Sequence, residues 1–235
     1  MKRVKKHYMS ILSLVLAMVV ILSAEARAEL FGFAAITNNS GVSSTYAQQL
    51  AVDVTDPGGN QVLFTFYSDG PASSLYDVPS PIAGAITDIY FDDSAGLLAF
   101  DSIFGDSGAG VTFVNSGAGT SPVNLPAGNT VVPPFVATQP LSVESDPNPP
   151  VNGVNPGEYV ALLYDIVSGD YAGVRNALLS GFAGADTLRI GMHVRGIDPT
   201  GVNQSDSFIM TPVPGAVILG LLGLGIAGWK LRRFA

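Results

Sequence analysis

Apolar residues in the middle of this chain recur at every second position, and this period limits the possible folds more than any other feature. Two runs, QLAVDVTD at 49–56 and QVLFTFYS at 61–68, show it most clearly. The positions that a strand with one buried face would turn inward are Leu50, Val52, Val54, Val62, Phe64 and Phe66. Because turn-forming residues separate the two runs, we predict a hairpin with a five-residue loop.

The same reasoning predicts most of the secondary structure between residues 29 and 211. Further strands are expected at 85–93, 97–104, 110–115, 158–166, 187–196 and 205–210. One helix is expected from Asp170 to Ser180, with Asp170 as its N-cap and Gly181 as its C-cap. Many short strands favour an all-β fold, a single antiparallel β-sandwich of jelly-roll type with one short helix.

A segment rich in proline and glycine interrupts the strands. Residues 115–157 hold nine of the 16 prolines. They fit either a linker between two domains or a long loop, and we favour the loop, because the strands on either side are too few to close separate cores. Residues 29–211 then form one domain, and we expect the loop to pack across one edge of the sandwich through Val131, Val132, Phe135 and Leu141.

Charge is distributed very unevenly along the chain. Residues 29–211 hold three arginines, no lysine and 18 of the 19 acidic residues, which gives this segment a net charge of −15. Such a surface repels nucleic acid and anionic lipid and attracts metal cations. The chain has no cysteine, which excludes a disulfide framework and a thiol nucleophile.

The N-terminal residues have the pattern of a secretory signal peptide. A basic start precedes an apolar run at 11–22, and Ala26 and Ala28 form an Ala-x-Ala site, so we expect Sec export and signal-peptidase cleavage after Ala28. The alternative is an uncleaved membrane anchor. The apolar run spans only ~18 Å as a helix, whereas the hydrocarbon core of a bilayer is ~30 Å thick.

The C-terminal residues predict a membrane anchor. The run 213–229 is uncharged over 17 residues, about 25 Å as a helix, and Pro214 falls in its first turn. The residues that would anchor its end at the cytoplasmic surface are Trp229, Lys230, Arg232 and Arg233. The expected topology is a single pass of the inner membrane with the body outside the cytoplasm.

Small residues lie on one face of this expected helix, at spacings of four, three and four. They are Ala216, Gly220, Gly223 and Ala227. Such a face permits close approach of a second helix, either a copy of itself or an intramembrane enzyme. Glycine is also common in membrane helices without this role, and both interpretations stay open.

A proline motif, a Gly/Leu-rich membrane helix and a terminal basic cluster together resemble the PEP-CTERM sorting signal of Gram-negative bacteria. The motif residues are Pro212, Val213, Pro214 and Gly215, with Val213 where the family has glutamate. The resemblance covers residues 212–235. It implies recognition by a membrane exosortase and delivery to the cell surface or to an exopolysaccharide matrix, through a variant exosortase, or else simple retention as an anchor.

The sequence GDSGAG at 105–110 is similar to the nucleophile motif of trypsin-like proteases, which would make Ser107 reactive. That family needs a histidine upstream of the serine, and the histidine upstream here is His7, within the expected signal peptide. His193 lies downstream and would need Asp165 or Asp198 as its partner. We therefore interpret the motif as a turn between strands.

His193 shares one face of its expected strand with Arg189 and Arg195. Because the body is acidic, we expect these side chains on the outward face, paired with carboxylates of neighbouring strands. The alternative is a site for an anionic ligand such as an acidic sugar. One histidine without sulfur partners disfavours a zinc site.

The acidic residues Asp88, Asp92 and Asp93 are the best metal candidates. Asp88 and Asp92 would be about 13 Å apart along a straight strand, too far to bind one ion. Asp92 and Asp93 with a loop partner make a possible Ca²⁺ site, and the alternative is that these acids are solvated at a strand end.

These features favour a non-enzymatic, exported protein of the cell envelope or extracellular matrix, with a structural or adhesive role. A calcium-dependent carbohydrate-binding module is the alternative, and a hydrolase ranks third. The expected partners are the export machinery, an exosortase-like enzyme and exopolysaccharide, and nucleic acid is not among them.

Overall fold

The computed structural model describes residues 29–69, 80–108, 110–115, 123–146, 151–181, 188–197 and 204–211. The predictions of a signal peptide at 1–28 and of a sorting motif and membrane anchor at 212–235 lie outside these residues. Within the described ranges, no helix is both long and apolar enough to cross a membrane.

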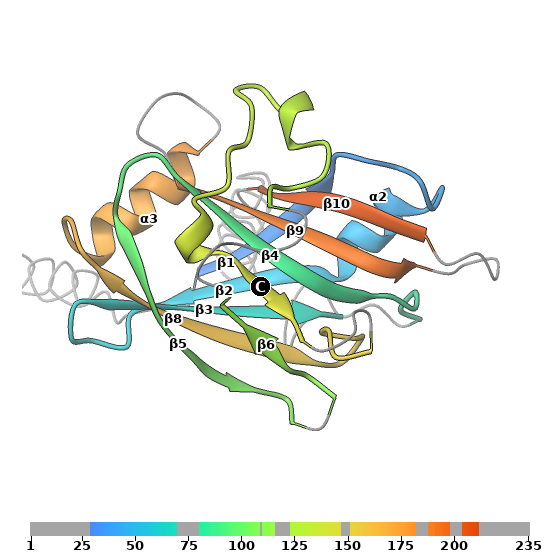
Figure 1. Ribbon diagram of the computed structural model, residues 1–235, viewed down its shortest axis with the longest axis horizontal. Coiled ribbons are helices and arrows are strands. Elements are labelled where there is room, and N and C mark those ends of the chain that lie inside the picture. The colour runs from blue at the N-terminus through green and yellow to red at the C-terminus, as the bar shows by residue number, and fades with distance from the viewer. Residues whose placement is uncertain are drawn as a thin grey trace, which may run out of the picture.

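The described residues form an antiparallel β fold, which confirms the predicted fold class at this level (Figure 1). The strands run in the order β5-β8-β3-β2-β1-β10-β9-β4-β7-β6 within one hydrogen-bonded sheet. Their bounds are β1 Glu29–Ala35, β2 Leu50–Thr55, β3 Gln61–Ser68, β4 Ala85–Asp93, β5 Leu98–Asp106, β6 Phe113–Val114, β7 Val143–Ser145, β8 Tyr159–Ile166, β9 Leu188–Ile197 and β10 Gln204–Thr211.

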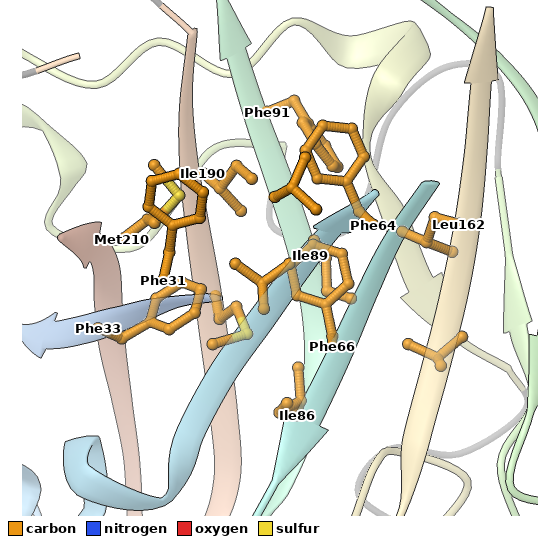
Figure 2. Close-up of a cluster of buried hydrophobic side chains, with 14 of the residues drawn as sticks. Phe31, Phe33, Phe64, Phe66, Ile86, Ile89, Phe91, Leu162, Ile190 and Met210 are labelled. Carbon is orange, nitrogen blue, oxygen red and sulfur yellow. The ribbon is translucent and has the colours of Figure 1, made fainter. Parts of the chain in front are cut away.

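The sheet curves so strongly that its two halves face each other across the core. Strands β3 and β4 are separated by four other strands in the sheet, yet Phe64 of β3 and Phe91 of β4 have ring centroids only 5.2 Å apart. Phe91 also lies 4.7 Å from the ring of Tyr164 on β8. The inward side chains of both halves thus make one apolar core (Figure 2).

The division into two separate sheets that a sandwich would show is not found in the hydrogen bonding. Strand β1 pairs with β2 on one side and with β10 on the other, and so joins the two halves into one ladder. Strand β1 was not expected from the sequence. Its inward residues Phe31 and Phe33 are both buried.

The predicted hairpin and helix are confirmed. Strands β2 and β3 pair from Leu50 and Ser68 to Thr55 and Leu63, around the loop 56–60. Helix α3 spans Tyr171–Ser180, and its N-cap Asp170 accepts a hydrogen bond of 2.8 Å from the N–H of Gly173. Gly181 is the C-cap, as expected.

Two other short elements depart from the prediction. Helix α2, Ser43–Tyr46, follows β1 and was not expected. The Pro-rich segment 115–157 contains strand β7, whose Val143 pairs with Ile89 of β4, so the segment is not loop throughout. Three residues of strand in a segment rich in proline gave no clear alternation to detect.

Candidate functional site

Residues 123–142, here called the strap, cross the outer face of β4, β9 and β10. Leu125 and Phe135 of the strap pack with Tyr90 of β4 and Ile209 of β10 in a second apolar cluster. Thr138 also donates its N–H to the carbonyl oxygen of Phe91 at 2.6 Å. The segment was expected across an edge of the sheet, but it packs on the outer face of strands that lie inside the sheet order.

The four residues expected to pack this segment against the sheet differ in burial. Phe135 and Leu141 are buried, Phe135 in the outer cluster and Leu141 in the main core. Val131 is half-buried against the outer cluster. The expectation was wrong for Val132, which is 88% exposed, because residues 132–134 contact the sheet through the carbonyl oxygens of Pro133 and Pro134 and their side chains face solvent.

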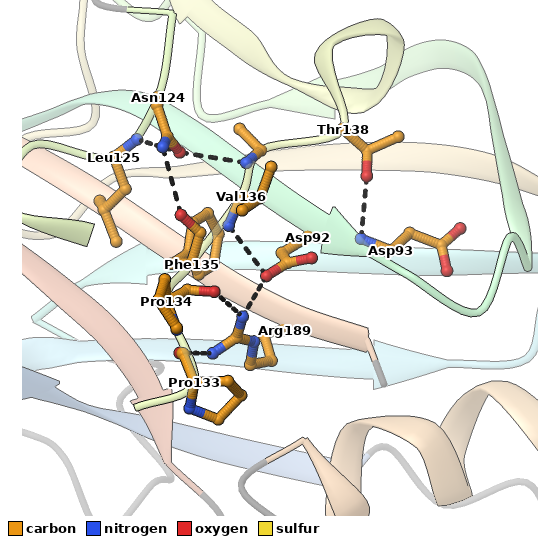
Figure 3. A network of polar contacts seen from close by, with 11 residues as sticks. Asp92, Asp93, Asn124, Leu125, Pro133, Pro134, Phe135, Val136, Thr138 and Arg189 are labelled. Carbon is orange, nitrogen blue, oxygen red and sulfur yellow. Dashed lines mark hydrogen bonds and ion pairs between the residues drawn. The ribbon is translucent and has the colours of Figure 1, made fainter. Parts of the chain in front are cut away.

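Arg189 of β9 fastens the strap to the sheet (Figure 3). Its guanidinium donates to the carbonyl oxygens of Pro133 at 2.7 Å and Pro134 at 2.6 Å, and it pairs with the carboxylate of Asp92 on β4. Its Cζ atom lies 5.4 Å from the ring centroid of Phe135. One buried cation therefore joins two strands and the strap through its planar fork of donors.

Asp92 and Asp93 are both engaged by protein donors. Asp92 accepts from Arg189 and, at 3.0 Å, from the N–H of Val136. The Oδ2 atom of Asp93 accepts from the N–H groups of Leu97 at 2.8 Å and Leu98 at 2.9 Å, and burial raises the pKa of this carboxyl. These acids are buried rather than solvated.

The calcium hypothesis gains no support from this arrangement. In the part of the chain that the structure describes, no three acidic or histidine side chains gather where they could hold a metal ion. Asp88 lies in a separate network from Asp92, and the charge of Asp92 is already balanced by Arg189. A Ca²⁺ ion takes about six to eight oxygen ligands, and the Oδ2 atoms of both Asp92 and Asp93 already accept hydrogen bonds from the protein.

Asp88 and His193 form the second polar network, on β4 and β9. The two residues are register partners, and His193 Nδ1 lies 3.2 Å from Asp88 Oδ2. The same oxygen accepts from the hydroxyl of Thr87 at 2.6 Å and lies 3.6 Å from Arg195. The predicted cross-strand pairing with carboxylates is confirmed.

The expectation that this face is open to solvent was wrong for Arg189 and His193. Their exposed fractions are only 4% and 8%, and the strap covers Arg189 through Pro133, Pro134 and Phe135. Alternation along the strand separated its two faces correctly. It carried no information on which segment would cover the outer one.

Ser207 lies beside the second network on a third strand, and this placement was not expected from the sequence. It lies directly opposite His193, so that Asp88, His193 and Ser207 occupy one row across β4, β9 and β10. These are the residue types of a hydrolase triad. Ser207 is only 1% exposed, however, and its Oγ atom makes no hydrogen bond within the described residues, to His193 or otherwise.

Ser107 belongs to a different region of the molecule. It lies in the exposed turn after β5, where its Oγ atom accepts from the N–H of Tyr159 at 3.2 Å. Gly108 donates to the Asp106 side chain at 2.7 Å and completes the turn. Residues 106–108 thus form a turn, as expected. No contact joins Ser107 to His193 in the described structure.

Comparison with protein-family models, with curated proteins and with solved structures finds no match for this chain.

Proposed function

We propose that this chain is an exported, non-catalytic protein of the cell envelope or extracellular matrix, with a structural or adhesive role. The observation that carries the proposal is that the arginine and histidine side chains between residues 29 and 211 pair with carboxylates of the protein itself. All three arginines and the one histidine of this segment contact carboxylates of the fold. The pairs of Arg189 and His193 join neighbouring strands, and Arg189 also binds the strap.

The architecture suits such a role. Strands β3 and β8 contact β4 across the core, and we propose that the two halves of the curved sheet act as the layers of a sandwich joined through β1 and β10. The strap adds a second apolar cluster on the outer face. The buried pairs Arg189–Asp92 and His193–Asp88 join neighbouring strands, which favours a rigid domain.

The ends of the chain give its destination. Residues 1–28, with Ala26 and Ala28, direct export, and residues 212–235 retain the body at the membrane or pass it to an exosortase. An acidic body without lysine is also suited to the outer side, since it has no affinity for cytoplasmic polyanions.

Protease accessibility tests this localisation. In spheroplasts of a Gram-negative host, externally added protease should digest residues 29–211, while a cytoplasmic marker protein stays intact. A tag after Ala235 should be protected until the membrane is permeabilised with detergent. Resistance of the body to the protease before permeabilisation would contradict the proposal, provided that the purified protein is digested under the same conditions.

A further inference from the structure

Two tyrosines lie side by side on the outer face of the sheet, away from the strap. Tyr67 of β3 is the register partner of Tyr159 of β8, and their ring centroids are 5.9 Å apart with an interplanar angle of 44°. Tyr67 is half-buried, and Tyr159 is 36% exposed. The tilt keeps the rings from stacking on each other and leaves aromatic surface available to a ligand.

The next row of the sheet is made of small side chains and lies lower than the rings. Thr65 of β3 pairs with Ala161 of β8, and Ala161 pairs with Gly105 of β5. A Cβ atom built on Gly105 would meet no other atom within 4 Å. Ala161 is itself only 5% exposed, so the open part of this low floor beside the tyrosines is at Gly105.

Polar groups lie on both sides of the step, the name used here for Tyr67 and Tyr159 with the lower row at Ala161 and Gly105. Asp53 of β2 is the register partner of Thr65. Burial raises the pKa of Tyr67, and the charge of the nearby Asp53 raises it further. Burial also raises the pKa of Asp53. Ser107 is exposed beside Tyr159.

These groups match the chemistry of a sugar ring. A pyranose has an apolar face of C–H groups, which packs on aromatic rings, and a rim of hydroxyl groups, which donate to carboxylate and hydroxyl oxygens. An extended polymer also fits a shallow step better than a compact ligand, which needs a closed pocket.

The charge of the body selects among polysaccharides. All three arginines of residues 29–211 are in ion pairs with carboxylates, and the segment has a net charge of −15. A polymer rich in uronic acid would be repelled by this surface. We propose that the step formed by Tyr67, Tyr159 and the floor at Ala161 and Gly105 binds a neutral polysaccharide chain. This inference rests on the proposed function, since only an exported protein would meet such polymers in a matrix.

Affinity electrophoresis of the full chain tests this inference. The protein is purified in a detergent without a sugar head group and run through native gels that contain dextran, laminarin, hydroxyethylcellulose or, as the acidic polymer, alginate. Tyr159→Ala removes the more exposed ring, and Gly105→Leu fills the floor without deleting a packing contact. Val132→Ala, an exposed apolar residue of the strap, is the matched control, and circular dichroism verifies the fold of each variant.

We expect at least one neutral polymer to retard the wild-type protein and alginate not to retard it. Tyr159→Ala and Gly105→Leu should each weaken binding about tenfold or more, in line with the loss of a central aromatic contact, whereas Val132→Ala should bind as the wild type does. No retardation by any neutral polymer, equal retardation by alginate, or unchanged binding of both step variants would overturn the inference. Such a result leaves the export test untouched, because that test reads localisation alone.

Discussion

Leu125 of the strap lies directly on Gly191 of β9. A Cβ atom at Gly191 would come within 2.7 Å of Leu125 Cδ2, so the absence of a side chain at this position lets the strap approach the sheet. Glycine inside a strand has this use where another segment comes close.

Gly191→Ala should therefore lower the free energy of unfolding by about 1–3 kcal/mol, as overpacking in a tight site does. Urea unfolding measures the change. Gly105→Ala is the matched control, since a Cβ atom there meets nothing within 4 Å, and it should have little effect. Leu125→Ala combined with Gly191→Ala should cost less than the sum of the single changes, because the added methyl then has room. Strict additivity would contradict the contact.

The pair of Arg189 and Asp92 gives a second prediction. Both side chains are buried, so Arg189→Met leaves an unpaired carboxylate and should cost about 3–5 kcal/mol in unfolding free energy. The double variant Arg189→Met with Asp92→Leu removes both charges and should recover part of that loss. Limited proteolysis should cut the strap faster in the single variant. A single variant as stable as the wild type, with an equally resistant strap, would argue against the fastening role.

Asp93 gives a prediction about pH. Burial raises its pKa above 3.8, and its Oδ1 atom, which has no hydrogen-bond partner among the described residues, can carry the proton. The native state thus binds this proton more tightly than the unfolded state does. The stability that the protonated group contributes is present below the unfolded pKa and is lost as pH rises through the folded pKa.

Asp93→Asn removes this dependence, because an amide does not titrate in the same range. Unfolding free energies of the wild type minus those of Asp93→Asn should fall as pH rises from about 3.5, and then level off above the folded pKa. Urea unfolding of both proteins across the same series of buffers measures the difference. A difference that stays constant, or rises with pH, would show that Asp93 is not held in this way.

The sequence was sufficient to predict local structure. It was insufficient to predict which segment covers the outer face of the sheet. The hairpin of β2 and β3 and the caps of α3 follow from alternation and from turn and cap residues, which act within a few positions. The covering of Arg189 depends on strap residues 55 and 56 positions earlier in the chain, which no local period encodes. Gly191, in the middle of an otherwise regular strand, was the one local signal of a close approach.

The candidate site shows the same division. Alternation placed Arg189, His193 and Arg195 on one face, and pairing with carboxylates followed from the charge of the body. The row of Asp88, His193 and Ser207 needed the register of three strands, which depends on pairing between distant segments. The tyrosine pair on β3 and β8 was missed for this reason too, since Tyr159 lies 92 positions after its partner Tyr67 (159 − 67).

Val213 gives a prediction for the sorting segment. If an exosortase reads a carboxylate between Pro212 and Pro214, Val213→Glu should be processed more completely than the wild type in cells that contain the enzyme. Val213→Gln, of similar size without the charge, is the control. Immunoblotting of the full-length and shortened forms measures the ratio. Equal processing of all three proteins would show that residue 213 does not control recognition.

The mass of the C-terminal peptide of the mature protein tests the central claim most directly. The chain is expressed in matched strains with and without an exosortase, and its terminal peptides are identified by mass spectrometry. The account predicts a start at Glu29 in both strains, and loss of the residues that follow the motif at 212–215 only where the exosortase is present. An intact N-terminus with all residues to Ala235 in both strains would contradict export and sorting together.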